Sequence, residues 1–346
     1  DCLGRVNRLS LHPTVWEGGV LPTGFSFEGA LSNAFRAAHF RTFPWIYATV
    51  YALIVALFYV VAAFLSRDAI LEFIQAIEAL ENANLDESDP REVMAQVFAT
   101  LTPFFPIALN VTIGSWVVWA VFEAASQRRY VRDERFSLRL GADELRMMVV
   151  GLMWVLLNIV CFLPMLFVLF GSGTSLFNQA LDGQSAASME NEIIASGFGL
   201  LGLMLLLFPV YVFFATRLSP CFAMTIKDRR IVFFDAWNVS RGRFWPILGA
   251  FLIIAVAGGI VSSVVDQAFQ FGLAGFMSRF SNVQSGEEAM QLVFSAAFLV
   301  PTGLYIFASM FMSALQQHFN GAPAAFAARH DPRGGVDDTA RMAVFD

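Results

Sequence analysis

Six long apolar segments without a single charged residue constrain this chain more than any other feature of its sequence. A transmembrane helix needs about 20 consecutive, mostly apolar residues. Each segment therefore predicts one membrane-spanning helix. The segments are residues 44–66, 93–122, 147–181, 193–216, 244–265 and 289–317. We expect their hydrocarbon portions near residues 45–65, 100–122, 147–170, 194–216, 245–266 and 292–315.

The overall composition agrees with this interpretation. Of the 346 residues, 57% are hydrophobic and 14% are charged, and 37 are Phe. A soluble domain carries about 25% charged residues, so this chain has too few polar side chains to cover a water-facing surface. That excludes a soluble enzyme, a nucleic-acid-binding protein and a disordered scaffold. Because the apolar runs are continuous rather than alternating, they exclude β-barrel strands. The sequence predicts an all-α, polytopic membrane protein.

Basic residues are distributed unevenly between the connecting segments. Residues 1–43, 123–146, 217–243 and 318–346 together hold 19 of the 22 Arg and Lys residues. Short loops that face the cytoplasm carry an excess of Arg and Lys. The sequence therefore predicts that these four segments, and both termini with them, are cytoplasmic.

The same boundaries predict three parts in the chain. Residues 1–43 form a cytoplasmic N-terminal segment with an amphipathic helix, and residues 44–317 form the six-helix transmembrane domain. Residues 318–346 form a cytoplasmic tail. We expect this tail to be mostly irregular, because from residue 321 on it is rich in Ala, Gly, Asp and Arg and lacks a sustained apolar face.

Three cytoplasmic segments share one design, a short amphipathic stretch that ends in basic residues directly before a span. The first places Phe27, Leu31 and Phe35 on one helical face. Amphipathic helices of this kind lie in the membrane interface, with their basic residues near the lipid phosphates. We expect cytoplasmic surface helices in these stretches, which are residues 27–45, 136–147 and 231–246.

Arg and Trp residues at these boundaries are candidates for contact with lipid head groups, because Arg attracts anionic lipids and Trp favours the interfacial region. The alternative interpretation is topological anchoring, which any multi-pass protein needs. The candidate head-group residues are Arg36, Arg41, Trp45, Arg241, Arg243 and Trp245.

Residues 236–249, AWNVSRGRFWPILG, follow the end of a span at FFATRLSP, residues 213–220. This region resembles a recurring signature of bacterial six-helix inner-membrane protein families. These families include the membrane domain found with some glycerophosphodiester phosphodiesterases. The resemblance covers mainly residues 200–265 and implies a multi-pass protein of the bacterial inner (plasma) membrane. The phosphodiesterase catalytic domain is a soluble barrel, and the resemblance does not extend to it.

The sequence contains no motif that predicts catalysis or a bound cofactor. All four histidines fall in cytoplasmic or boundary segments, so we expect surface histidines and no haem between the spans. The acidic segment at residues 67–92 offers oxygen ligands to a cation, but its spacing matches no EF-hand and predicts a solvated loop. We therefore predict no enzyme, no cofactor and no metal site.

A few polar residues near or within the spans are candidates for interhelical hydrogen bonds or for a cavity. Side chains of this kind need partners in the membrane. The candidates are Asn110, Ser115, Asn158 and Asp266. For Asp266 and for Glu123, at the ends of their spans, the plainer interpretation is that each is the first residue in contact with water.

These observations predict a non-enzymatic integral membrane protein that acts as an accessory or structural subunit or as a lipid-organising factor. Its expected partners are membrane lipids and a larger membrane protein complex, and nucleic acid is excluded. The alternative is a small transporter or lipid translocator that uses a cavity between proline-kinked helices, with a polar path through Asn110, Ser115 and Asn158. A third hypothesis, an intramembrane enzyme, has only Asp235 and His39 as acid–base groups near the inner interface.

Overall fold

The computed structural model describes residues 25–36, 42–69, 72–73, 75, 95, 98–181, 186–280, 291–292 and 295–331. Within these residues it contains helices and connecting loops and no strand. Six helices are long and apolar enough to cross a membrane, which confirms the predicted all-α, multi-pass fold. They are α2 (Phe43–Leu65), α5 (Phe104–Arg132), α6 (Ala142–Leu181), α7 (Ala186–Leu218), α10 (Phe244–Phe280) and α12 (Ala296–Arg329).

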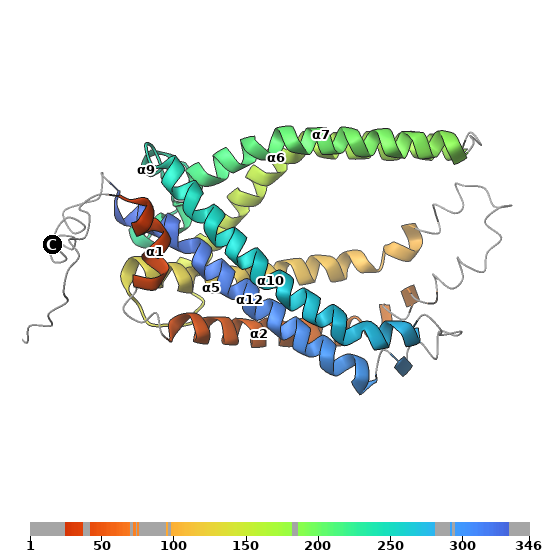
Figure 1. The fold of residues 1–346 in the computed structure, drawn as a ribbon, viewed down its shortest axis with the longest axis horizontal. Helices are drawn as coiled ribbons and strands as arrows, with labels where there is room; N and C mark the ends of the chain where they lie inside the picture. The colour runs from red at the N-terminus through yellow and green to blue at the C-terminus, as the bar shows by residue number, and fades with distance from the viewer. Residues whose placement is uncertain are drawn as a thin grey trace, which may run out of the picture.

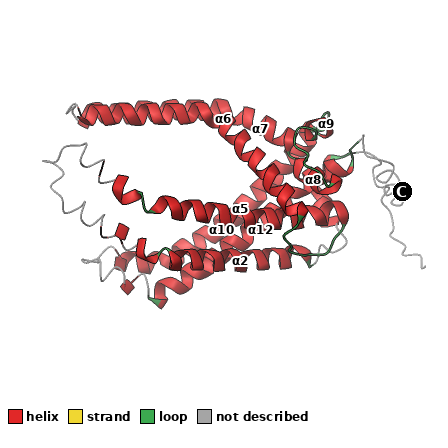
Figure 2. Ribbon diagram, turned by 180° about the vertical axis from the view of Figure 1, so that it is seen from behind, coloured by secondary structure: helices red, strands yellow, loops and turns green. Residues whose placement is uncertain are grey.

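The long helices are close together at one end of the molecule and apart at the other (Figures 1 and 2). Helices α6 and α7 pack along each other and form an arm that diverges from the bundle of α2, α5, α10 and α12. We call the two ends the packed end and the splayed end. Three short helices lie at the packed end: α1 (Phe27–Arg36), α8 (Cys221–Asp228) and α9 (Ala236–Val239).

Helix α12 continues through Arg329, whereas the sequence analysis predicted an irregular tail from residue 318. The segment GAPAAFAA, residues 321–328, is almost entirely buried at the packed end. Ala favours helix more than any other residue, and its small side chain allows α12 to approach α1, α5 and α8 closely. Residues 321–328 lack a sustained apolar face because small Ala and Gly side chains pack on several sides of the helix, and not because the segment is irregular. Residues 332–346 lie outside the description.

The first of the three predicted surface elements is a helix, and the other two differ from the prediction. Small and polar residues of α1 face the protein, and Asn33 Nδ2 donates a hydrogen bond of 2.9 Å to the Ala322 carbonyl. The rings of Phe27 and Phe35 stay partly exposed. Residues 133–141 form a loop before α6 begins, and the third element contains only the single turn α9. Its Val232 and Phe233 are buried in the core, so this stretch packs inward.

A network of ion pairs joins the end of α5 to the start of α6. The Arg128 guanidinium is buried against the Glu144 carboxylate and also donates to the Ser137 carbonyl. Arg132 donates to Asp143 at 2.7 Å and also contacts the Ile226 carbonyl. Because buried charges are tolerated only when paired, this network requires α5, α6 and α8 to meet at the packed end.

Candidate functional site

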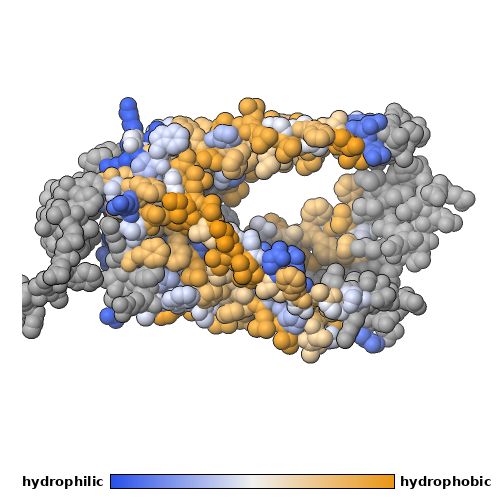
Figure 3. Space-filling model, in the orientation of Figure 1, coloured by the Kyte–Doolittle hydropathy of each residue, from blue (hydrophilic) through white to orange (hydrophobic). Residues whose placement is uncertain are grey.

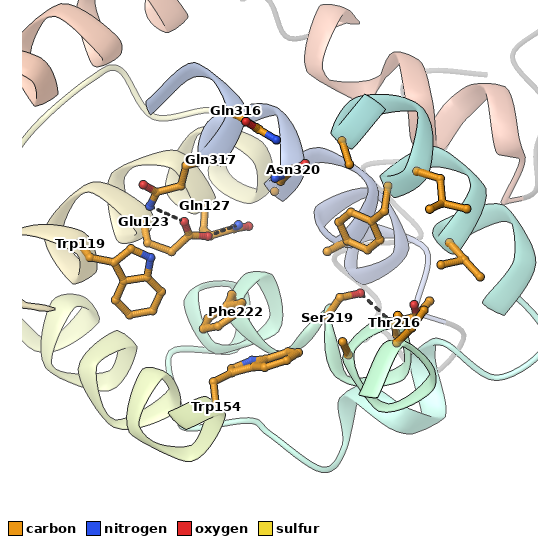
Figure 4. Close-up of a pocket in the computed structure, with 18 of the residues that line it drawn as sticks. Trp119, Glu123, Gln127, Trp154, Thr216, Ser219, Phe222, Gln316, Gln317 and Asn320 are labelled. Atoms are coloured by element: carbon orange, nitrogen blue, oxygen red, sulfur yellow. Dashed lines mark hydrogen bonds between the residues drawn. The ribbon is translucent and has the colours of Figure 1, made fainter. Parts of the chain in front are cut away.

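A cavity of about 680 Å³ lies where the arm diverges from the bundle. Every long helix contributes to its wall, together with α8, and the wall has a polar side and an apolar side (Figure 4). The polar side is formed mainly by α5 and α12, with Thr216 and Ser219 from the end of α7 and the residues after it. The polar lining residues are Glu123, Gln127, Thr216, Ser219, Ser313, Gln316, Gln317 and Asn320.

Glu123 is the one charged residue in the cavity wall. Its Oε1 accepts a hydrogen bond of 2.8 Å from Gln127 Nε2, and its Oε2 accepts one of 2.8 Å from Gln317 Nε2. These bonds connect α5 to α12, as Figure 4 shows. The prediction that Glu123 is simply the first water-exposed residue is wrong, because α5 continues through Arg132 and buries this carboxylate in the packed end.

Gln127 has a hydrogen-bond acceptor that no described residue satisfies. Its side chain is 1% exposed, and its Oε1 atom is buried without a hydrogen-bond partner. Gly321 of α12 permits this placement, since a Cβ atom there would lie 2.7 Å from Gln127 Nε2. An unmet acceptor in a buried wall costs about 1–3 kcal/mol.

Aromatic rings form much of the wall beside Glu123. Trp119 of α5 and Trp154 of α6 both contact Phe222 of α8, with ring centroids 5.8 and 5.7 Å apart. The Trp154 Nε1–H group donates to Cys221 Sγ at 3.1 Å, which satisfies this buried donor and orients the ring. The remaining wall is apolar and contains residues such as Leu252 and Ala255 of α10.

No Lys, Arg or His is among the residues that line the cavity. The nearest basic residues along the chain are engaged elsewhere at the packed end. Arg217 donates to the Ser240 carbonyl at 2.9 Å and lies over the Trp237 ring. Arg128 pairs with Glu144. The charge that lines the cavity is therefore the single Glu123 carboxylate.

The four polar residues that the sequence analysis proposed for a cavity do not line this one. Asn110 is exposed and lies in the N-terminal part of α5, whereas the buried residues of this helix begin at Ala120. Ser115 is partly buried, and Asn158 Nδ2 donates to the Trp154 carbonyl of its own helix at 2.7 Å. Asp266 accepts a hydrogen bond of 2.9 Å from the Tyr305 hydroxyl, which joins α10 to α12. The structure therefore does not bring Asn110, Ser115 and Asn158 together at this cavity.

The candidate head-group residues divide into two groups. Trp45, Arg241 and Trp245 have exposed side chains. Arg243 instead donates to the His330 carbonyl at 2.6 Å and lies over the Phe25 ring, 5.1 Å from its centroid. It thus connects the start of α10 to the end of α12. Arg41 and the side chain of Arg36 lie outside the described residues, as does most of the acidic segment at 67–92.

His318 is buried, contrary to the expectation of a surface histidine. Its Nδ1 is 2.7 Å from Ser126 Oγ, and its Nε2 is 3.1 Å from the Tyr130 hydroxyl. The Tyr130 ring stacks on the imidazole with centroids 4.7 Å apart. Because these partners come from α5 and His318 comes from α12, only the pairing of the two helices reveals the cluster.

A spacing on α5 could have predicted the polar wall. Trp119, Glu123 and Gln127 recur every four residues, which places them on one helical face. The partner residues on α12 recur at similar spacing, from Ser313 through Gln317 to Asn320. The apolar run ends at Phe122, so the sequence analysis assigned Glu123 and Gln127 to a cytoplasmic segment and not to the same helical face as Trp119.

Comparisons with known proteins assign no relative to the chain. No family model matches it, and no curated protein and no solved structure matches it. The described residues therefore define the class of protein: an all-α chain with six helices long and apolar enough to cross a membrane, and an amphipathic cavity between them.

Proposed function

We propose that this chain is a non-enzymatic, lipid-organising protein of the bacterial inner membrane that binds an amphipathic membrane molecule in the cavity. The polar part of the molecule would lie beside Glu123, and its apolar chains would lie between the arm and the bundle. The observation that carries the proposal is the position of the cavity. Its polar side is at the packed end, and Figure 3 shows that the arm and the bundle leave an opening bordered by apolar side chains.

The membrane itself supports this assignment. A bilayer has no water to fill the space between diverging helices, so lipid chains must occupy it. The two sides suit such chains, since Val212 of α7 and Leu252 of α10 are apolar residues that line the cavity. Binding sites for amphiphiles combine a mostly apolar wall with a few well-placed polar groups, and the cavity has this composition.

Orientation follows from charge in this proposal. Four segments of the sequence hold 19 of the 22 basic residues, and the described parts of these segments lie at the packed end, so we propose that this end, α1 and both termini are cytoplasmic. The exposed Trp45 and Trp245 then lie at the inner interface, with the exposed Phe27 and Phe35 of α1 in the inner leaflet. The resemblance to bacterial six-helix inner-membrane families supports the same membrane.

The test is native mass spectrometry of the protein extracted in polymer nanodiscs without detergent. We expect about one lipid to stay bound after the belt of bulk lipid is removed. The substitution Ala255→Trp fills the cavity and should abolish retention. Ala257→Trp, two residues along α10 and outside the cavity wall, is the control and should retain the lipid. Equal retention in both variants would contradict the proposal, and a protein bound at fixed stoichiometry in place of lipid would favour an accessory subunit.

A further inference from the structure

We infer that the cavity selects a primary ammonium group, as in the head group of an ethanolamine-type phospholipid. This inference rests on the proposed function and names the class of ligand that the same site takes. It depends on three properties of the wall: its charge, the remaining hydrogen-bond acceptor sites of the Glu123 carboxylate, and its aromatic surface.

The charge of the wall favours a cation. Glu123 is the sole ionisable acid or base among the lining residues apart from Tyr51 and Tyr211. Because Glu123 is almost fully buried, the low dielectric around it strengthens the attraction between this carboxylate and a positive group. The same carboxylate repels an anionic head group that presents only a phosphate. No lining Arg or Lys offsets that repulsion.

The hydrogen-bond inventory favours a head group that donates. Each Glu123 oxygen accepts one hydrogen bond from the protein and has a further acceptor site available. Gln127 Oε1, on the same helical face, accepts none. A primary ammonium carries three N–H donors and can therefore use the remaining acceptor sites on both Glu123 oxygens. A quaternary ammonium carries no N–H donor, so it would make no hydrogen bond to the Glu123 carboxylate.

The aromatic wall adds attraction for the same group. Ring faces of Trp, Tyr and Phe attract cations within about 6 Å of the ring centroid. Trp119, Trp154 and Phe222 lie together beside Glu123 (Figure 4), and all three line the cavity. Farther along the polar side, Thr216, Gln316 and Asn320 supply neutral hydroxyl and amide donors for a phosphate that follows the amine.

The experiment is lipid competition read by native mass spectrometry. Full-length protein is placed in nanodiscs that contain equal amounts of phosphatidylethanolamine, phosphatidylcholine and phosphatidylglycerol with identical acyl chains. We expect the retained lipid to be phosphatidylethanolamine, with a preference of about tenfold or more over each of the others. A tenfold preference corresponds to about 1.4 kcal/mol, which one charge-assisted hydrogen bond can supply.

Two variants and one control assign the preference to the cavity. Glu123→Gln keeps the shape of the side chain and should reduce the preference to about twofold or less. Trp119→Leu removes one ring face, leaves the carboxylate in place and should reduce the preference about threefold. Glu134→Gln changes a carboxylate in the 133–141 loop, outside the cavity wall, and should leave the preference unchanged. Each variant is first checked for an unchanged thermal unfolding transition, and Trp119→Leu keeps the test decisive where Glu123→Gln does not fold.

The outcomes separate this inference from the proposed function. Retention of all three lipids without preference, or a preference that survives both cavity variants, overturns the ammonium inference and leaves lipid binding intact. Retention of no lipid overturns the proposed function itself. A final arm adds free ethanolamine: displacement of the bound lipid at millimolar concentration would assign the site to a soluble amine, and retention supports the lipid.

Discussion

The packed end and the splayed end share the same six long helices, yet apolar side chains of these helices are buried at one end and exposed at the other. On α10, Ile247 is completely buried in the packed end, whereas Ile260, further along the same helix, is 63% exposed. On α6, Met147 is buried, and Phe167 is exposed. Hydrophobicity alone therefore does not determine which residues form the core of this protein.

The reason is that the solvent around membrane-spanning helices is lipid and not water. Lipid chains are as apolar as Leu or Ile, so no hydrophobic driving force brings helices together inside the bilayer. The packed end instead combines close approach at small residues, such as Ala322 and Ala325, with buried polar interactions. Among the described residues, fewer are buried at the splayed end, and under the proposed function lipid chains would occupy the space between its helices. The cavity lies between the packed end and the splayed end, where the arm diverges from the bundle.

Among the substitutions that test this difference, Arg128→Ala should lower the free energy of unfolding the most. This substitution leaves the Glu144 carboxylate buried without its main partner, so the free energy of unfolding should fall by about 3–5 kcal/mol. Thermal unfolding in nanodiscs measures the change. Arg139→Ala is the control: Arg139 is 51% exposed and pairs with Glu134 at 2.9 Å, and its loss should cost about 1 kcal/mol or less. Equal losses in both variants would show that the packed end does not depend on its buried ion pairs.

Two glycines on α6, one at the packed end and one in the arm, allow the tightness of packing at the two ends to be compared within one helix. A Cβ atom at Gly151 would lie 2.5 Å from a ring carbon of Trp119, so Gly151→Ala should lower the free energy of unfolding by about 1–3 kcal/mol. At Gly171, in the arm, a Cβ atom meets nothing within 4 Å. Gly171→Ala should therefore be neutral or stabilising by up to about 1 kcal/mol, because Ala favours helix. A loss at Gly171 as large as that at Gly151 would mean that the arm is packed as tightly as the bundle.

The smallest effect is a pH dependence at the packed end. Burial lowers the pKa of His330 below its ordinary value, and the nearby Arg243 and Arg329 lower the pKa further, although the Phe326 carbonyl opposes them. The unfolded chain thus binds a proton more readily than the folded one does. Stability contributed by neutral His330 should be fully present above about pH 7.5 and decrease as pH falls through about 6.5, the ordinary pKa of histidine. The free energy of unfolding of the His330→Gln variant should therefore change less between pH 7.5 and 5.5 than that of the unmodified protein. If both free energies change equally with pH, His330 is not the source of the pH dependence.

The sequence predicted the spans well and the site poorly, and two residues show why. Pro44 and the uncharged, mostly apolar residues 45–66 predict one span without reference to any other part of the chain, and α2 occupies that position. Glu123 predicts nothing by itself, because its meaning depends on Gln317, which is 194 residues away. Arg243 likewise fits a lipid contact as a sequence feature, and its contact with the His330 carbonyl appears only in the folded chain.

The sequence by itself determined the class of this protein: six apolar runs of sufficient length require six helices, since each helix satisfies its backbone hydrogen bonds within its own segment. The tertiary structure alone decided where those helices meet. It brought Glu123, Gln127 and Gln317 together, buried His318, and separated the arm from the bundle. These features depend on contacts between distant helices, which small residues and buried polar pairs create and which no local pattern of apolar residues contains.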